Sequence, residues 1–527
     1  MSKHSTGIQR RITWITGTIL AAIVLLTAWM LQSRASEQAY AAPAAHYVAP
    51  TGKDTNSGTL QSPWRTLQYA ADHAEAGSTI YIRSGTYRER LNITRSGSAS
   101  AGAITFTNYN KEQPILDGTG LSVDGIQGLI ELNNASYITI NGLSVRNYTT
   151  TSRDNVPVGM YVHGAGKKIS LLNNKVYNIR NTATPAGSDL SGRDAHGIAV
   201  YGTAAPASIQ QLTISGNELY NLVLGSSEAM VINGNVEQFE VTNNAVHDSD
   251  NIGIDVIGYE GTSPNDQYDA ARNGTIAGNT VYNISANQNP SYGKKLPNNC
   301  NCAGGIYVDG GKSIVIERNT SYANDIGIEL ASEHKGKVTK DITVRSNVVY
   351  ENRYTGIAFG GYDEERGTTT GSVIINNTLF GNDTLSSESG DGAGQLLIQY
   401  GTSGNTVLNN IMVSSASGVL IRNDYPSSNN KVDYNLYTLN ANVDTAYWIW
   451  QGDAYEGLPA YQKASKQDAH SRQAAPQFIN TSKADFHLQA TSPARNSGVW
   501  NDILKGTSDR DGKAWVPSST VTIGAYQ

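Results

Sequence analysis

Cysteine, methionine and charged residues are scarce in this chain of 527 residues. It has 2 Cys, 5 Met and 16% charged residues, whereas about a quarter of a typical soluble domain is charged. Two cysteines are too few for a disulfide framework. The 39 Lys and Arg nearly balance the 45 Asp and Glu, and no basic stripe stands out. A nucleic-acid partner is therefore not expected.

Glycine and tyrosine are abundant instead, with 53 Gly and 29 Tyr. Glycine and asparagine favour turns, and the many Val, Ile and Thr residues between them favour strands. This composition predicts an all-β protein made of short strands and tight turns. A repeat architecture can hold so long a chain in one body.

The first 45 residues predict export. Lys3, Arg10 and Arg11 precede an apolar run from Ile12 to Leu31, and Ala39-Tyr40-Ala41 offers a small-x-small cleavage site. The run is also long enough to span a bilayer, so residues 1–45 are either a signal peptide or an N-terminal membrane anchor. We expect a secreted or surface-anchored protein whose residues 46–527 form a single domain.

An internal repeat decides the fold class. Seven segments, from ISLLNNKVYN to VIINNTLFGN, align on an asparagine, and each has an aromatic residue three positions later. The asparagines are Asn174, Asn217, Asn244, Asn279, Asn319, Asn347 and Asn377. Their spacing varies from 27 to 43 residues. A second strand often follows, opened by Gly-Ile, as in GIDV at 253 and GIEL at 327.

Constant strands with variable spacing predict a parallel β-solenoid, because insertions enter the loops while stacked strands keep their register. Asparagine tolerates the left-handed conformation and can stack its amide between coils, which explains its recurrence. We expect the helix near residues 64–74 to cap one end and residues 475–527 to close the other. An all-β sandwich is the alternative.

The opening YVAPTGKDTNSGT, SPWRTLQ and AGSTIYIRSGTY, the repeated coils and the closing DFHLQATSPARNSG resemble right-handed parallel β-helix proteins of carbohydrate metabolism. That group includes pectate lyases and several glycosidases. The resemblance covers residues 46–527 and implies a right-handed parallel β-helix with an oligosaccharide or polysaccharide substrate. It does not imply which sugar, since this fold hosts many reactions.

One coil departs from the repeat. Where other coils have Tyr-Asn it has His247-Asp248, and seven residues later Asp255 follows Gly-Ile. Alternation places Ile254 and Val256 inward and Asp255 outward. Two carboxylates on either side of one tight corner suit acid/base chemistry, although Asp248 capping a turn beside a solvated Asp255 is the simpler interpretation.

Outward residues of neighbouring coils should form a column, because strands stack about 4.8 Å apart. Carboxylates, amides and aromatic rings in such a column suit a neutral sugar. The candidate substrate-binding residues are Glu228, Asn233, His247, Tyr259, Tyr307, Asp309, Glu329, Glu333 and His334.

Two Asp seven residues apart on one coil also resemble the catalytic arrangement of glycoside hydrolase family 136, the lacto-N-biosidase group. This resemblance implies Asp248 as acid/base, Asp255 as nucleophile, retention of configuration and no cofactor. We expect a monomer whose only partner is its saccharide substrate.

Two other functions stay open. A lyase acting on a uronate polymer would need Ca²⁺, for which Asp248, Asp250 and Asp255 are candidates, and a base such as Lys335, Lys337, Arg193 or Arg318. No Lys occupies the outward slots of the core coils, however. A non-catalytic glycan-binding surface protein would need neither.

The longest irregular loop, NQNPSYGKKLPNNCNC at 287–302, lies next to the candidate site and could set its specificity. It ends with Cys300 and Cys302. One intervening residue allows only a strained bridge, so the sequence leaves their pairing open.

Overall fold

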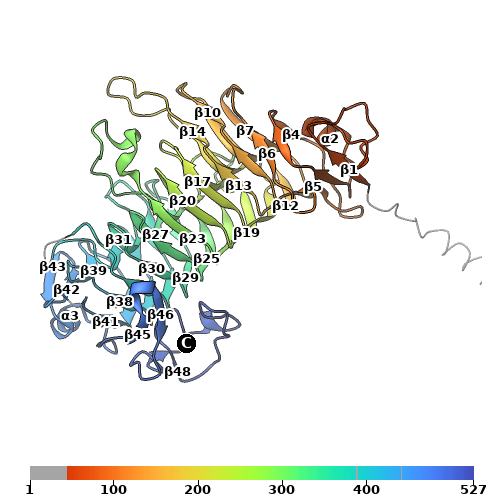
Figure 1. Ribbon diagram of the computed structural model, residues 1–527. Helices are drawn as coiled ribbons and strands as arrows, with labels where there is room; N and C mark the ends of the chain where they lie inside the picture. Colours follow the sequence, from red (N-terminus) through yellow and green to blue (C-terminus); the bar gives the residue numbers. More distant parts are fainter. Residues whose placement is uncertain (1–43, 387–389, 441) are drawn as a thin grey trace, which may run out of the picture. The chain divides into compact units, whose positions relative to one another are not determined.

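The computed structural model describes residues 44–386, 390–440 and 442–527. In this part of the chain successive coils stack on one another, and their strands form three long parallel sheets, here called A, B and C (Figure 1). The predicted parallel β-solenoid is confirmed. Residues 1–43, which carry the predicted export segment, lie outside the described residues. No helix among the described residues is long and apolar enough to cross a membrane.

Sheet A contains one strand from most coils, and its pairings are parallel. Its strands in spatial order are β1 (Ala45–Val48), β2 (Thr79–Ile82), β5 (Ile104–Asn108), β8 (Ile138–Asn141), β12 (Gly166–Leu172), β16 (Ile209–Ser215), β19 (Val236–Thr242), β22 (Arg272–Ala277), β25 (Lys312–Glu317), β29 (Thr343–Arg345), β33 (Val373–Ile375), β37 (Thr406–Leu408) and β40 (Lys431–Asp433), with β28 (Val338–Lys340), β32 (Thr368–Thr370) and β36 (Thr402–Ser403) as a side branch.

Sheet B follows sheet A within each coil. Its strands are β3 (Gly85–Tyr87), β6 (Pro114–Asp117), β9 (Ser144–Arg146), β13 (Lys175–Tyr177), β17 (Glu218–Leu222), β20 (Ala245–Ser249), β23 (Thr280–Ile284), β26 (Thr320–Tyr322), β30 (Val348–Tyr350), β34 (Thr378–Phe380), β38 (Ile411–Val413), β41 (Leu436–Thr438) and β44 (Arg472–Gln473).

Sheet C completes the coil and carries the candidate site. Its strands are β4 (Leu91–Ile93), β7 (Ile126–Asn133), β11 (Val156–His163), β15 (His196–Gly202), β18 (Met230–Gly234), β21 (Ile254–Ile257), β24 (Gly304–Asp309), β27 (Ile326–Ala331), β31 (Thr355–Phe359), β35 (Leu396–Ile398), β39 (Val419–Asn423), β42 (Tyr447–Trp450) and β43 (Asp453–Glu456). Only the last pairing, β42 with β43, is antiparallel.

Alternating side chains of the strands in the coils fill the interior. On β21, Ile254 and Val256 are fully buried in the main apolar core, together with Ile306 and Ile328 of the next two coils. The residue between them, Asp255, therefore points out of the coil, as the alternation predicted.

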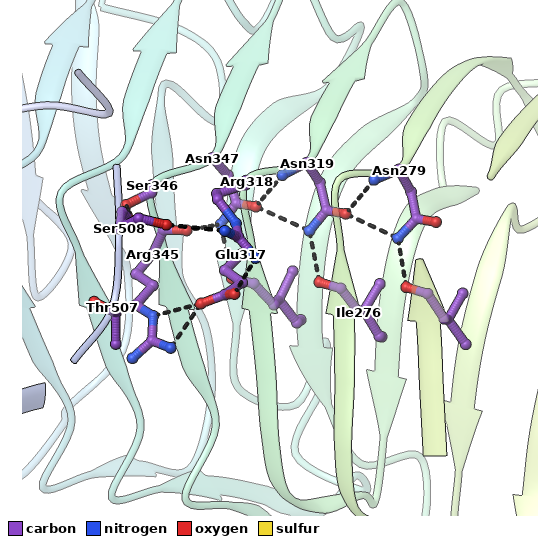
Figure 2. Close-up of polar contacts among 12 residues, drawn as sticks. Ile276, Asn279, Glu317, Arg318, Asn319, Arg345, Ser346, Asn347, Thr507 and Ser508 are labelled. Atoms are coloured by element: carbon purple, nitrogen blue, oxygen red, sulfur yellow. Dashed lines mark hydrogen bonds and ion pairs between the residues drawn. The ribbon is translucent and has the colours of Figure 1, made fainter. Parts of the chain in front are cut away.

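The repeated asparagines form a continuous ladder inside the coils. Figure 2 shows Asn279, Asn319 and Asn347, where each side-chain Nδ2 donates to the next Oδ1 at 2.9–3.0 Å. The ladder consists of Asn174, Asn217, Asn244, Asn279, Asn319, Asn347, Asn377, Asn410 and Asn435. Beyond it, the Asn435 Nδ2 donates to Asp468 at 3.3 Å. The predicted stacking of amides is confirmed.

The predicted left-handed conformation of these asparagines is wrong by one position. The residue before each ladder asparagine adopts positive φ, for example Asn243 at 56° and Arg318 at 54°. The ladder asparagine itself points inward, and its amide also donates to a backbone carbonyl; the Asn319 Nδ2 donates to the Ile276 carbonyl at 2.9 Å (Figure 2). Its recurrence thus reflects the need to satisfy buried polar groups at the turn.

Aromatic rings stack outside sheet B at the position three residues after the ladder asparagines from Asn174 to Asn347. Tyr220, His247 and Tyr282 are stacked with centroids 5.3 and 4.6 Å apart, and the row continues through Tyr322 and Tyr350. His247 therefore takes the place of a tyrosine in this row.

The two ends of the stack differ. The predicted N-terminal helix is α2 (Leu67–His73), whose Leu67 and Ala70 join the core. At the other end α3 (Leu458–Ser465) packs Tyr461 on Trp448.

The segment from residue 475, which was expected to close the end of the stack, instead lies against the outward sides of sheets A and B. It contains two antiparallel pairs, β45 (Phe478–Asn480) with β46 (Asp485–Leu488) and β47 (Gly498–Val499) with β48 (Thr520–Val521). Arg318, in the turn after β25, reaches Ser508 at 2.9 Å (Figure 2), and Phe486 contacts Tyr350 of sheet B.

Candidate functional site

A pocket of about 810 Å³ lies over the outward face of sheet C. Its floor is formed by three neighbouring strands, β21, β24 and β27. Asp255 pairs in register with Tyr307, and Tyr307 with Glu329, so these three side chains form one row across the floor. The outward column predicted for these residues is confirmed.

Six acidic residues line this pocket, which we call the carboxylate pocket; they are Glu228, Asp255, Glu260, Asp309, Glu329 and Glu333. Asp255 is only 2% exposed and Glu329 5%. Among the described residues no Lys or Arg lines the pocket. The acids therefore have no basic partner within the lining.

Burial dominates the electrostatics of the acids. It raises the pKa of Asp255 well above its ordinary value, and the charges of Glu228 and Asp309 raise that pKa further. Burial, together with the charge of Glu333, raises the pKa of Glu329 to about 8. Because like charges buried close together cannot all ionise, some of these carboxyl groups stay protonated at neutral pH.

Several buried acceptor atoms around the pocket have no hydrogen-bond partner. They are the Asp255 Oδ1, the Gln399 Oε1 and the Asn233 Oδ1. Asp255 and Gln399 line the pocket, while Asn233 donates through its Nδ2 to Glu260 at 2.9 Å. Unpaired buried acceptors are costly, and they favour a ligand that supplies donors or positive charge.

The loop after β23 forms one wall. It contains η1 (Ala286–Gln288) and η2 (Pro290–Tyr292), and Tyr292 faces the pocket. Asp325 holds both ends of the loop, since it accepts from the backbone N–H groups of Ala286 and Ala303 at 2.8 and 3.2 Å.

The same loop contains the two cysteines of the chain. Cys300 and Cys302 form a disulfide with their Cα atoms 5.3 Å apart. This settles the pairing that the sequence left open. Both residues line the pocket, so the bridge stiffens a wall of the site.

The structure does not bring Asp248 and Asp255 together. Asp248 lies on β20 of sheet B, where its carboxylate contacts the His247 Nδ1 at 2.7 Å and accepts from Asn283 at 3.1 Å. It is not among the described residues that line the pocket. The corner between the two strands turns their side chains onto different faces, so the expected pairing across it is wrong.

The predicted substrate-binding residues fall into two groups. Glu228, Tyr307, Asp309, Glu329 and Glu333 line the pocket. Four others do not. Asn233 and His334 lie beside it, Tyr259 lies under the ammonium groups of Lys312 and Lys337, and His247 is in the aromatic row of sheet B.

The residues considered for a lyase are also dispersed. Asp250 accepts from the Leu224 N–H at 2.7 Å and is not among the described residues that line the pocket. Lys335 pairs with Glu365 at 2.6 Å and Lys337 with Asp266 at 3.6 Å. Arg318 contacts Ser508, and Arg193 donates to the Ala183 carbonyl.

Sequence reasoning missed several lining residues, all in loops or loop-proximal positions; they are Glu260, Tyr292, Tyr354, Tyr362 and Gln399. Insertions between strands break the period of the repeat, so the alternation that located Asp255 and Glu329 could not locate these. The length of the 287–302 loop was the signal for Tyr292, and it did point to this wall.

Comparisons with known proteins identify the family. Residues 46–205 match the family described as "Pel9A-like, right handed beta helix region", and residues 196–410 match "Right handed beta helix region". The uncharacterized protein YwoF of Bacillus subtilis (strain 168) is 42% identical over 451 residues, which cover 85% of this chain and 92% of that protein. This chain belongs to the same family of right-handed β-helix proteins.

Pectate lyase PEL9 of Emericella nidulans is 32% identical to this β-helix protein over 171 residues, covering 29% of the chain and 37% of that enzyme. Two solved structures are similar at a TM-score of 0.47. Pectate lyase Pel9A is 16% identical and covers 92% of this chain and 97% of its own; the GH136 lacto-N-biosidase from Eubacterium ramulus is 14% identical and covers 82% and 70%.

Proposed function

We propose that this β-helix protein is an exported, monomeric glycoside hydrolase that cleaves an uncharged oligo- or polysaccharide in the carboxylate pocket. The observation that carries the proposal is the row Asp255–Tyr307–Glu329, which holds two buried carboxyl groups and an aromatic ring on one floor. Export rests on the sequence of residues 1–45, which predicts secretion or anchoring at the cell surface.

Glycoside hydrolysis needs one protonated and one ionised carboxyl group on opposite sides of the scissile bond. The pKa of Glu329, raised to about 8, suits the general acid that protonates the leaving oxygen. Asp255 then acts as the carboxylate on the other side. Its pKa is raised as well, so the active form is the one in which the pair holds a single proton and Glu329 carries it. No cofactor takes part in this chemical step.

The spacing of the strands supports one stereochemical outcome over the other. Asp255 and Glu329 are two strands apart, which places their backbones about 9.6 Å from each other at a strand spacing of about 4.8 Å. Inverting enzymes separate their carboxyl groups by about 6.5–9.5 Å and retaining enzymes by about 5–5.5 Å. We therefore propose inversion in place of the retention that the Asp248 pairing implied.

The lining favours a neutral sugar. Tyr292, Tyr307 and Tyr354 provide ring faces or edges, and the carboxylates accept hydroxyl hydrogen bonds. A polyuronate carries negative charge on each residue and would be repelled by six acids that have no basic neighbour in the lining.

A Ca²⁺-dependent polysaccharide lyase is the second candidate. The name of the relative PEL9 and the Pel9A-like match favour it. That match ends at residue 205, however, before the first residue of the carboxylate pocket, and the described lining offers no Lys or Arg to take the α-proton.

The test is an activity screen on neutral and uronate glycans that follows new reducing ends and the ultraviolet absorbance of unsaturated products in parallel. Hydrolysis gives reducing ends without absorbance. Absorbance on a uronate polymer would establish the lyase. Binding without any turnover would leave a glycan-binding protein.

A further inference from the structure

Three potential metal ligands converge at the edge of the carboxylate pocket. Glu260 follows β21, Asp309 ends β24 and His334 follows β27. One ligand atom from each side chain lies within 4.8 Å of the others. The residues come from three separate loops or strand ends, so their convergence is a product of the fold.

The imidazole in this group has an unused nitrogen. The His334 Nε2 is buried and has no hydrogen-bond partner. His487 differs in this respect, because both of its ring nitrogens have partners. Its Nδ1 contacts Asp485 at 2.6 Å and its Nε2 contacts Asp511 at 2.7 Å.

A second, independent observation concerns Asn233, which contacts Glu260. The exposed fraction of Asn233 is only 2%. Its Nδ2 donates to the Glu260 Oε2 at 2.9 Å, whereas its Oδ1 has no hydrogen-bond partner. A buried amide with an unpaired acceptor beside the Glu260 carboxylate is suited to a positively charged ligand.

The two carboxylates are held in place but not neutralised. Asp309 accepts from the Glu333 N–H at 2.7 Å, and Asn233 orients Glu260. Neither Glu260 nor Asp309 forms an ion pair with a described Lys or Arg. Contacts that orient ligands without consuming their charge are typical of metal sites.

We propose that Glu260, Asp309 and His334 bind a divalent transition-metal ion such as Mn²⁺ or Zn²⁺. One imidazole and two carboxylates suit these ions, whereas Ca²⁺ prefers a larger, all-oxygen set. The ion ties the segments after β21 and β27 to the end of β24. Because Glu260 and Asp309 also line the carboxylate pocket, a sugar hydroxyl in the pocket could occupy a free coordination position of the ion.

The experiment titrates Mn²⁺ and Zn²⁺ into the chelator-treated full-length protein and measures binding by calorimetry, with electron paramagnetic resonance for Mn²⁺. We expect one saturable site per chain. His334→Gln should weaken binding at least tenfold, and Glu260→Gln should do the same. His487→Gln is the matched control, because both of its ring nitrogens are already occupied, and it should bind as the wild type does.

Melting temperatures separate lost ligands from lost folding. Without metal, His334→Gln should melt like the metal-free wild type, and added Mn²⁺ should raise the melting temperature of the wild type but not that of His334→Gln. Absence of saturable binding, or equal affinity in His334→Gln, would overturn the site. Tighter binding of Ca²⁺ than of Mn²⁺ and Zn²⁺ would overturn its assignment to a transition metal.

This result does not depend on hydrolysis. Asp255 is not a ligand, so Asp255→Asn should bind Mn²⁺ with an affinity within a few-fold of the wild type even if it abolishes turnover. Metal binding by a protein that hydrolyses no glycan would refute the proposed function and leave the metal site standing.

Discussion

Asp255 and Glu329 occupy the same outward row of sheet C, two strands apart, with Tyr307 between them. Both are nearly fully buried in a pocket whose described lining contains no basic residue. A sugar ring that enters the pocket meets a carboxyl group on either side of an aromatic residue. The following predictions test what this arrangement does.

Replacing Asp255 should abolish turnover, while replacing Asp248 should not. Asp255→Asn removes the carboxylate from the row, and we expect kcat to fall roughly 10²–10⁴-fold in a reducing-end assay. Asp248→Asn changes only a residue bonded to His247 and Asn283 on sheet B. Equal loss in both variants would restore the pairing that the sequence suggested.

The pH dependence should report Glu329. As the general acid it must be protonated, so on the alkaline side kcat should decline as the pH rises through the pKa of about 8, while the need for an ionised Asp255 lowers kcat at acid pH. Glu329→Gln should remove this alkaline limb along with most of the activity. An alkaline limb that survives in Glu329→Gln would assign the acid to another residue.

Stability should change with pH in a matching direction. The pKa of Glu329 is raised from 4.5 to about 8 in the folded protein, so the folded state holds a proton that the unfolded state has lost. The stabilisation is fully present below pH 4.5 and is lost as the pH rises toward 8. Glu329→Gln should flatten this slope in denaturant titrations; an unchanged slope would contradict the shifted pKa.

The anomer released first should be inverted. Proton NMR during early turnover distinguishes the two configurations before mutarotation mixes them. Retention would instead require a carboxylate closer to Asp255 than Glu329 is, such as Asp309 on the adjacent strand β24.

The asparagine ladder should contribute measurably to stability. Asn279→Ala leaves the backbone N–H of Asn244 and the side chain of Asn244 without their acceptor, which should cost about 1–3 kcal/mol in the free energy of unfolding. Glu240→Ala, at an exposed outward position of β19, should change it by less than about 0.5 kcal/mol. Similar losses in both would show that the ladder is not a special source of stability.

The repeat in the sequence predicted the coils and the side of each strand on which a residue lies. Strand alternation located Asp255, Tyr307 and Glu329 correctly, because a period of two fixes the side of a strand on which a residue lies. The prediction for Asp248 was wrong, because two residues close in sequence can lie on different sheets when a corner of the coil separates them. Tyr292 and Glu260 were missed because loops carry no period.

The ladder also has a direction. Each amide donates toward the C-terminal end, from Asn174 through Asn435 to the carboxylate of Asp468. An asparagine accepts from one side and donates to the other, so another coil can be inserted anywhere within the row without leaving a group unpaired. A carboxylate only accepts. Asp468 is therefore the terminator of the series, and a lengthened or shortened version of this protein must keep it last.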